Sequence, residues 1–192
     1  MDIHYFKETP EPVLDVESEF SIDYVINLAK KGNWYMIYLL SKYVSREVSI
    51  LVDSKDNYFV DWGTIGSVEL SPPISAVLPF KLWVHTHPSN TAYWSITDRN
   101  TLQIAKGILD KALVLGENGL LSTTLQPTTS CTGDIVNPNP KWTEEEVMGW
   151  LEYNLDNFDS DFVEDYYSPK VKYPWNGMRI FTDNFDSDGK GW

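Results

Sequence analysis

The sequence predicts a single α/β or α+β domain, in which short β-strands alternate with helices. Stretches with helical periodicity predict the helices, and short runs rich in β-branched and aromatic residues predict the strands. An Asn-Gly pair between two such runs predicts a hairpin. The chain has 192 residues, 42% of them hydrophobic, which is enough for one ordinary core.

The first elements expected along the chain are two helices. Residues 22–31 have a weak helical pattern that stops at Gly32, a residue type common just beyond the end of a helix. A second helix is expected from Trp34 to about Val44, because apolar residues recur on one side of that segment.

A β-hairpin is expected next. Glu47 opens the strand-forming run 48–52, and the polar residues 53–57 turn the chain back into a second run, 58–62. Residues 65–70 are expected to form a further strand, which a pair of prolines ends.

The second half of the domain continues the alternation. Residues 81–87 are expected to form a strand that Pro88 stops, and a helix is expected from 97 to 109. Two further strands, 111–116 and 120–126, flank the Asn-Gly turn as a hairpin.

The pattern divides the chain into four parts. We expect a lead-in over residues 1–20, the α/β domain over 21–127, a Pro- and Thr-rich linker over 128–142 and a C-terminal part over 143–192. No internal repeat is present.

The C-terminal part is expected to begin with a helix and to continue as an acidic, aromatic appendage. Thr143 and Glu146 form the T-x-x-E pattern of a capping box, which opens a helix. Its expected apolar face is formed by Val147, Leu151 and Leu155. Such an appendage fits either a packed extension of the domain or an arm that docks a partner.

Charge and cysteine content exclude several classes of function. The net charge of -13 argues against binding nucleic acid or anionic membranes, both of which require clustered Lys and Arg. The lone Cys131 can form neither an intrachain disulfide nor a cysteine-based zinc site. The chain begins without the features of a signal peptide, and no apolar run reaches membrane-spanning length, so a cytoplasmic protein is expected.

One segment concentrates residues that can bind a metal ion. His85 and His87 lie two apart on an expected strand, so both imidazoles project from the same face. Pro88 ends that strand, and the following loop can return Asp98 from the first turn of the next helix. Two imidazole nitrogens and one carboxylate oxygen, at about 2.0–2.2 Å, leave the fourth position of a tetrahedral zinc ion open for water.

This segment resembles the motif of the JAMM (MPN+/JAB) zinc metallopeptidase family. That motif is H-[ST]-H-P, seven residues counted from the Pro, and then S-x-x-D. The residues that match its fixed positions are His85, Thr86, His87, Pro88, Ser95 and Asp98. The resemblance covers roughly residues 34–126 and implies an MPN/JAB-like domain, a mixed β-sheet flanked by helices. It also implies one Zn²⁺ per chain, held by His85, His87 and Asp98.

The family also implies a catalytic glutamate on an upstream strand, which falls on Glu47. Many members have a Gly three residues after that glutamate, whereas Ile50 stands here. Glu69 is the alternative base, although only Glu47 follows a helix and opens a strand. Ser95 is implied to donate to the developing oxyanion, and it is equally suited to cap the helix that carries Asp98.

The resemblance implies a zinc-dependent isopeptidase or peptidase. Its expected partner is a ubiquitin-like protein or its conjugate, cleaved after the C-terminal tail. The alternatives are a non-catalytic scaffold that retains the MPN fold and a zinc hydrolase of another amide substrate. Trp83, Tyr93 and Trp94 flank the motif and are expected either to anchor its loop or to line a substrate groove.

Overall fold

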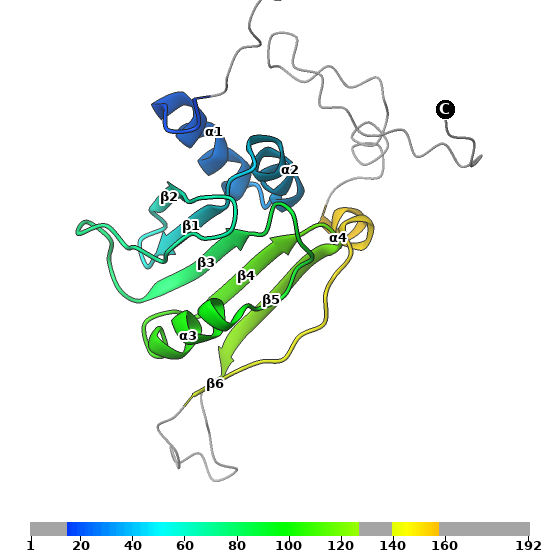
Figure 1. Cartoon of the computed structure of the whole chain (residues 1–192). Helices are drawn as coiled ribbons and strands as arrows, with labels where there is room; N and C mark the ends of the chain where they lie inside the picture. Colours follow the sequence, from blue (N-terminus) through cyan, green and yellow to red (C-terminus); the bar gives the residue numbers. More distant parts are fainter. Residues whose placement is uncertain (1–14, 127–139, 158–192) are drawn as a thin grey trace, which may run out of the picture.

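A computed structural model describes residues 15–126 and 140–157. Within them the protein is a mixed α and β fold built around one six-stranded sheet (Figure 1). The expected lead-in up to residue 14, the single cysteine and the acidic, aromatic stretch from residue 158 lie outside the described residues. None of the helices in the described residues has the length and apolar character needed to cross a membrane.

Two helices open the described chain, α1 (Glu19–Lys30) and α2 (Trp34–Val44). The bounds of α2 agree with the prediction, whereas α1 begins three residues earlier because Ser18 caps it by accepting a hydrogen bond from the Ser21 backbone N–H. Between the helices, Gly32 has a φ of 69°, the left-handed conformation that lets the chain turn directly into α2.

The sheet has the strand order β2-β1-β3-β4-β5-β6. Its strands are β1 (Val48–Asp53), β2 (Tyr58–Trp62), β3 (Phe80–Thr86), β4 (Lys111–Gly116), β5 (Gly119–Gln126) and β6 (Lys141–Trp142). All neighbouring strands are antiparallel except β3 and β4, which are parallel. A parallel pair requires a crossover connection, and here it contains α3 (Ile96–Ile104).

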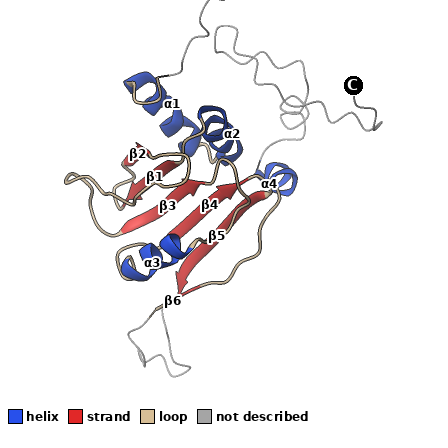
Figure 2. Cartoon of the chain, in the orientation of Figure 1, coloured by secondary structure: helices blue, strands red, loops and turns tan. Residues whose placement is uncertain are grey.

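Helices cover both faces of the sheet (Figure 2). On one face, α1, α2 and α4 (Trp150–Asn157) contribute to the larger apolar cluster, together with Val48, Ile50 and Val84 of the sheet. On the other face, α3 packs on a smaller cluster that includes Leu51 and Trp83. Because side chains alternate along a strand, His85 faces α3 whereas Thr86 faces α2.

The strand predicted over residues 65–70 is wrong. After β2 the chain makes a tight turn in which the Thr64 N–H donates to the Ser67 carbonyl at 2.9 Å, and Ile65 is 62% exposed. A Cβ at Gly63 would lie 2.1 Å from the same carbonyl, so only glycine fits there. The turn takes up backbone groups that an additional strand would have needed for pairing.

The helix predicted to start at the Thr143 capping box is also wrong. Thr143 instead continues the pairing of β5 and β6, since its hydroxyl accepts from the Thr124 backbone N–H at 2.9 Å. The same hydroxyl donates to Glu145 rather than capping a helix with Glu146. A capping box needs free backbone N–H groups in a first helical turn, and the helix begins only at Trp150.

Helix α4 packs against the sheet through its aromatic residues. Trp150 is buried and its indole N–H donates to the Gly116 carbonyl of β4 at 2.9 Å, while the Tyr153 hydroxyl donates to the Gly32 carbonyl at 2.7 Å. Leu151, expected on the apolar face, is 61% exposed because the helix starts later than predicted.

Helix α3 is shorter than the predicted 97–109. Its first residue is Ile96 and its last is Ile104. Gly107 follows with a φ of 86°, which ends the helical path, and Leu109 is fully buried beyond the helix.

The turn between β1 and β2 encloses a buried carboxylate. Asp53 accepts hydrogen bonds from the backbone N–H groups of Lys55, Asn57 and Val77 and from the Asn57 side-chain amide, at 2.8 to 3.1 Å. Burial alone would raise the pKa of Asp53, but these donors lower it to about 2. Asp53 is therefore a structural anion that closes the hairpin and the loop preceding β3.

Candidate metal centre

His85, His87 and Asp98 converge on one buried point, which we term the metal centre. His85 is near the end of β3, His87 directly follows it, and Asp98 lies in the first turn of α3. His85 Nε2 is 3.3 Å from Asp98 Oδ1, and His87 Nε2 is 3.6 Å from Asp98 Oδ2. One ligand atom from each residue lies within 4.8 Å of the others, so the three can bind a single metal ion.

Asp98 is held by the start of its own helix. Its backbone N–H donates to Ser95 Oγ at 3.1 Å, and its carboxylate accepts from the Ser95 backbone N–H at 2.8 Å. This is a complete capping box, in which the same carboxylate that faces the histidines also fixes the helix N-terminus. Ser95 therefore lies beside the metal centre and acts as a helix cap.

Aromatic rings surround the two imidazoles. Trp83 stacks on His85 with centroids 4.6 Å apart, and Trp94 lies 5.8 Å from the same ring. Tyr93 lies 4.9 Å from His87. Trp83 is 1% exposed and belongs to the core, whereas Tyr93 is 45% exposed, so the anchoring residue and the solvent-facing residue are different members of this group.

The unsatisfied ring nitrogens test whether a metal ion fits. Both nitrogens of His85 and Nδ1 of His87 are buried without a hydrogen-bond partner among the described residues, since the 3.3 Å contact of His85 with Asp98 lacks hydrogen-bond geometry. Leaving such a group unpaired costs about 1–3 kcal/mol. A metal ion would use the Nε2 lone pairs that face Asp98, so the residues fit a metal ion.

Protonation states in the centre also suit metal binding. Burial lowers the pKa of His85, an effect that outweighs the opposing pull of Asp98. Burial opposes ionisation of Asp98, but the His85 and His87 imidazoles and the Ser95 side chain hold its pKa well below the ordinary value. A neutral imidazole and an ionised carboxylate are the forms that bind metals.

Glu47 lies on the same side of the sheet as the metal centre. It directly precedes β1, in which Ser49 pairs with His85, and alternation places Glu47 and Ser49 on the face of that histidine. Glu47 is 7% exposed. Its backbone is fixed by the turn after β2, where its N–H donates to the Thr64 carbonyl at 2.8 Å and its carbonyl accepts from Gly63 at 2.9 Å.

Burial gives the Glu47 carboxyl a pKa far from its ordinary value. Desolvation is the largest cause, and the pKa rises to about 7. His87 and a hydrogen bond from the Val68 backbone lower it, while the negative Asp98 raises it further. A carboxyl that titrates near neutrality can both take and return a proton.

Glu69, the alternative base, makes no hydrogen bond or ion pair with these groups in the described part of the chain. It is exposed and lines a cavity of about 390 Å³ beside β2, together with Ser49, Leu51, Phe59 and Leu70. Among the described acidic residues, the structure thus brings Glu47, and not Glu69, into electrostatic contact with the metal centre.

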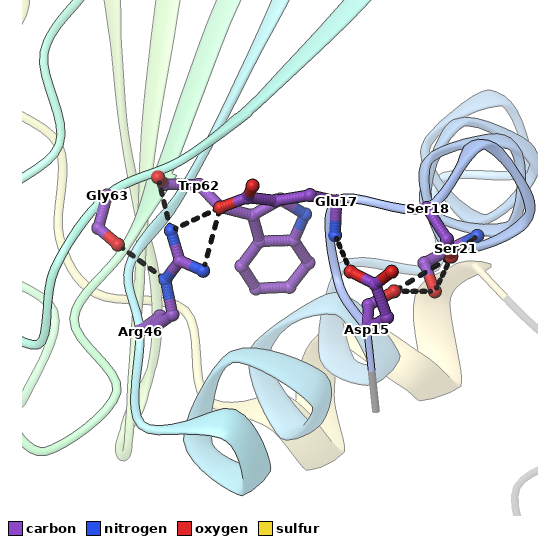
Figure 3. Close-up of polar contacts among 7 residues, drawn as sticks. All are labelled: Asp15, Glu17, Ser18, Ser21, Arg46, Trp62 and Gly63. Carbon is purple, nitrogen blue, oxygen red and sulfur yellow. Dashed lines mark hydrogen bonds and ion pairs between the residues drawn. The ribbon is translucent and has the colours of Figure 1, made fainter. Parts of the chain in front are cut away.

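Arg46 anchors the residue before Glu47, a role that no sequence signal indicated. Its guanidinium donates to the carbonyls of Trp62 and Gly63 at 2.9 and 2.7 Å, and both terminal nitrogens lie 3.2 Å from Glu17 Oε1 (Figure 3). Arg46 thereby ties the start of β1 to the end of β2 and to the segment before α1.

The loop between His87 and Ser95 rests on the β4–β5 turn. The Ala92 N–H donates to Asn118 Oδ1 at 2.7 Å, and the Glu117 N–H donates to the Asn90 carbonyl at 2.9 Å. A Cβ at Gly116 would lie 2.1 Å from the Ala92 nitrogen, so glycine permits this approach. The sequence identified this turn only as a hairpin and gave no sign that it holds the metal-centre loop.

Comparison of the chain with protein-family models gives no match, and comparison with curated proteins gives none either.

Proposed function

We propose that this protein is a zinc-dependent peptidase with a JAMM-type site on an MPN/JAB-like fold. The observation that supports it best is the buried cluster of His85, His87 and Asp98 with the protonatable Glu47 beside it. Buried polar atoms normally have hydrogen-bond partners, so the unpaired imidazole nitrogens of this cluster favour a site that binds a ligand.

Zinc is the metal that this ligand set favours. Two imidazole nitrogens and one carboxylate oxygen are borderline ligands that suit zinc, and three protein ligands leave the open position of a catalytic site. When bound, the ion would supply Lewis-acid chemistry, polarising the scissile carbonyl and acidifying water. Proton transfer and stabilisation of the oxyanion would then require the chain's own side chains.

Glu47 and Ser95 are proposed to perform that work. The Glu47 carboxylate accepts a proton from the attacking water and returns it to the leaving amine, a role suited to its raised pKa. The Ser95 hydroxyl, which accepts from the Asp98 N–H, retains its own proton to donate to the developing oxyanion.

The proposed substrate is the C-terminal tail of a ubiquitin-like protein, in a conjugate or a precursor. Such a tail is extended and rich in glycine. The cavity beside β2 lies along the edge strand of the described sheet, where a narrow extended peptide can bind by strand addition. Ser49 lines that cavity and pairs with His85, so a tail bound there would end near the metal centre.

The test uses a conjugate with a Gly-Gly-ended tail, incubated with the zinc-reconstituted full chain. We expect release of a free tail carboxylate, its loss on chelation, and its restoration by zinc. Glu47→Gln, loaded with the same amount of zinc, is the matched inactive control. Stoichiometric zinc without cleavage of any Gly-Gly-ended conjugate would reject the substrate class, and no zinc after reconstitution would instead favour a non-catalytic scaffold.

A further inference from the structure

A row of buried hydrogen bonds crosses from β1 through β3 to α2 on the face opposite the metal centre. The Val48 N–H donates to Thr86 Oγ1 at 3.0 Å, Thr86 Oγ1 lies 2.5 Å from Ser41 Oγ, and Ser41 Oγ donates to the Arg46 carbonyl at 2.7 Å. The side chains of Thr86 and Ser41 are both 0% exposed. We term these four groups the hydroxyl relay.

The direction of each proton in the relay is fixed by its two ends. A backbone N–H can only donate and a backbone carbonyl can only accept. The Ser41 hydroxyl donates its single proton to the Arg46 carbonyl. The Thr86 hydroxyl must therefore donate to Ser41 while it accepts from Val48. Every link is therefore satisfied in one orientation only.

The relay begins where the backbone pairing of β1 with β3 ends. The register between β1 and β3 runs only as far as the Ser49–His85 pair, so the Val48 N–H beyond it is bound by a side chain instead. On its other side, Thr86 is fixed by pairing with Leu115 of β4. Thr86 thus connects the beginning of β1 to the strand that carries the histidines.

Glu47 lies between the two residues that the relay holds. Arg46 and Val48, the residues held by the relay, are its two chain neighbours, and Thr86 lies between the two histidines of the metal centre. We propose that Thr86 and Ser41 are positioning residues, which hold Glu47 at a fixed place relative to the metal ligands. Its catalytic consequence rests on the proposed function, whereas the positioning itself does not.

The chain offers a matched control for the loss of a buried threonine hydroxyl. Thr123 of β5 is 1% exposed and donates to the Thr143 carbonyl at 2.7 Å, away from the relay. Thr86→Val and Thr123→Val each remove one such hydroxyl without changing the side-chain shape. Thr86→Ser restores the hydroxyl at the relay position.

The first readout needs no activity: the ¹³C signal of the Glu47 carboxyl is followed as zinc is added to the full chain. Wild type, Thr86→Ser and Thr123→Val should show the same zinc-induced shift, and Thr86→Val should show a smaller one. If Thr86→Val does not fold, Ser41→Ala at the next link should show the reduction. A wild-type response in both variants, or no response in the wild type, would overturn the proposal.

The second readout is turnover of the Gly-Gly-ended conjugate. Thr86→Val should lower kcat by roughly 10–100-fold, the usual effect of losing a residue that orients an active-site group, with KM and zinc content unchanged. An equal loss of kcat in Thr123→Val would show that the relay contributes only to the overall stability of the fold and does not position Glu47. If the wild type cleaves nothing, the proposed function fails, while the Glu47 signal still decides the positioning.

Discussion

Asp53 and Asp98 are two buried aspartates with lowered pKa values, one at the end of β1 and the other in the first turn of α3. Asp53 is fully buried, and all of its bonds come from N–H donors of its own turn and of Val77. Asp98 is 8% exposed, takes one N–H bond from Ser95, and turns the rest of its carboxylate toward two imidazoles.

A buried carboxylate with a low pKa therefore does not by itself identify a metal site. Hydrogen-bond donors lower the pKa of Asp53, and they also use up its lone pairs. The imidazoles beside Asp98 lower its pKa too, but His85 keeps unsatisfied nitrogens that a metal ion can use. What distinguishes a ligand is the chemistry of its partners.

The largest expected effect comes from removing a ligand. Asp98→Asn should abolish stoichiometric zinc binding, because two neutral imidazoles rarely hold a catalytic ion. Helix α3 should persist, since an Asn oxygen can still accept from the Ser95 N–H. Elemental analysis after dialysis and circular dichroism measure the two outcomes, and His87→Ala should lose zinc likewise.

Asp53→Asn is the control for Asp98→Asn. It should keep one zinc per chain, because Asp53 bonds only to donors of its own turn and of Val77. If Asp98→Asn retained stoichiometric zinc, the ligand assignment would be refuted and the two aspartates would be equivalent.

The next effect concerns Glu47, the proposed base. Glu47→Gln preserves side-chain volume and removes the proton-accepting charge, so turnover should fall by roughly 10²–10⁴-fold with zinc content unchanged. Glu69→Gln, exposed beside the cavity, should be nearly silent in kcat. The reverse result in steady-state kinetics would make Glu69 the base.

Ser95→Ala should have a smaller effect on turnover, a loss of roughly 10²–10³-fold if the hydroxyl donates to the oxyanion. It also removes a helix cap worth about 1 kcal/mol. Ser18→Ala is the matched control, because Ser18 caps α1 in the same way far from the metal centre. Equal kcat values in the two variants would leave Ser95 as a cap alone.

The smallest effect is on stability and depends on pH. Asp53→Asn places an amide N–H against existing donors, so its urea midpoint at neutral pH should lie below that of the wild type. The folded pKa of about 2 lies below the ordinary 3.8, so the stabilisation is present above 3.8 and is lost as pH falls toward 2. The gap between the two proteins should therefore close over that interval.

Asp56→Asn is the control for the Asp53 measurement. Asp56 lies in the same turn and forms an exposed ion pair with Lys81 of β3. Exposed ion pairs contribute little to stability. A gap between wild type and Asp53→Asn that stays constant with pH would show that the carboxylate charge is not what stabilises the turn.

Much of the fold follows from local patterns in the sequence. Apolar periodicity gave the bounds of α2, and alternation with turn residues gave the β1–β2 and β4–β5 hairpins. The errors at residues 65–70 and at Thr143 have different causes. The first segment follows a tight local turn in which the Thr64 N–H bonds to the Ser67 carbonyl, whereas Thr143 bonds to Thr124, 19 positions away. Tertiary contacts of that kind leave no periodic signal.

The candidate site likewise has a part that the sequence predicts and a part that it does not. The spacing of His85, His87 and Asp98 predicted that they would meet, because a strand end, a short loop and a helix start are local structures. The relay through Thr86 and Ser41 could not be predicted, since it joins residues 45 positions apart through side chains on the opposite face of the sheet.

The contact between the β4–β5 turn and the metal-centre loop has a practical consequence for protein engineering. Hairpin tips are usual places to insert an epitope or a fluorescent label. Here an insertion beside Asn118 would displace the acceptor of the Ala92 N–H and so disturb the loop that connects His87 to Asp98.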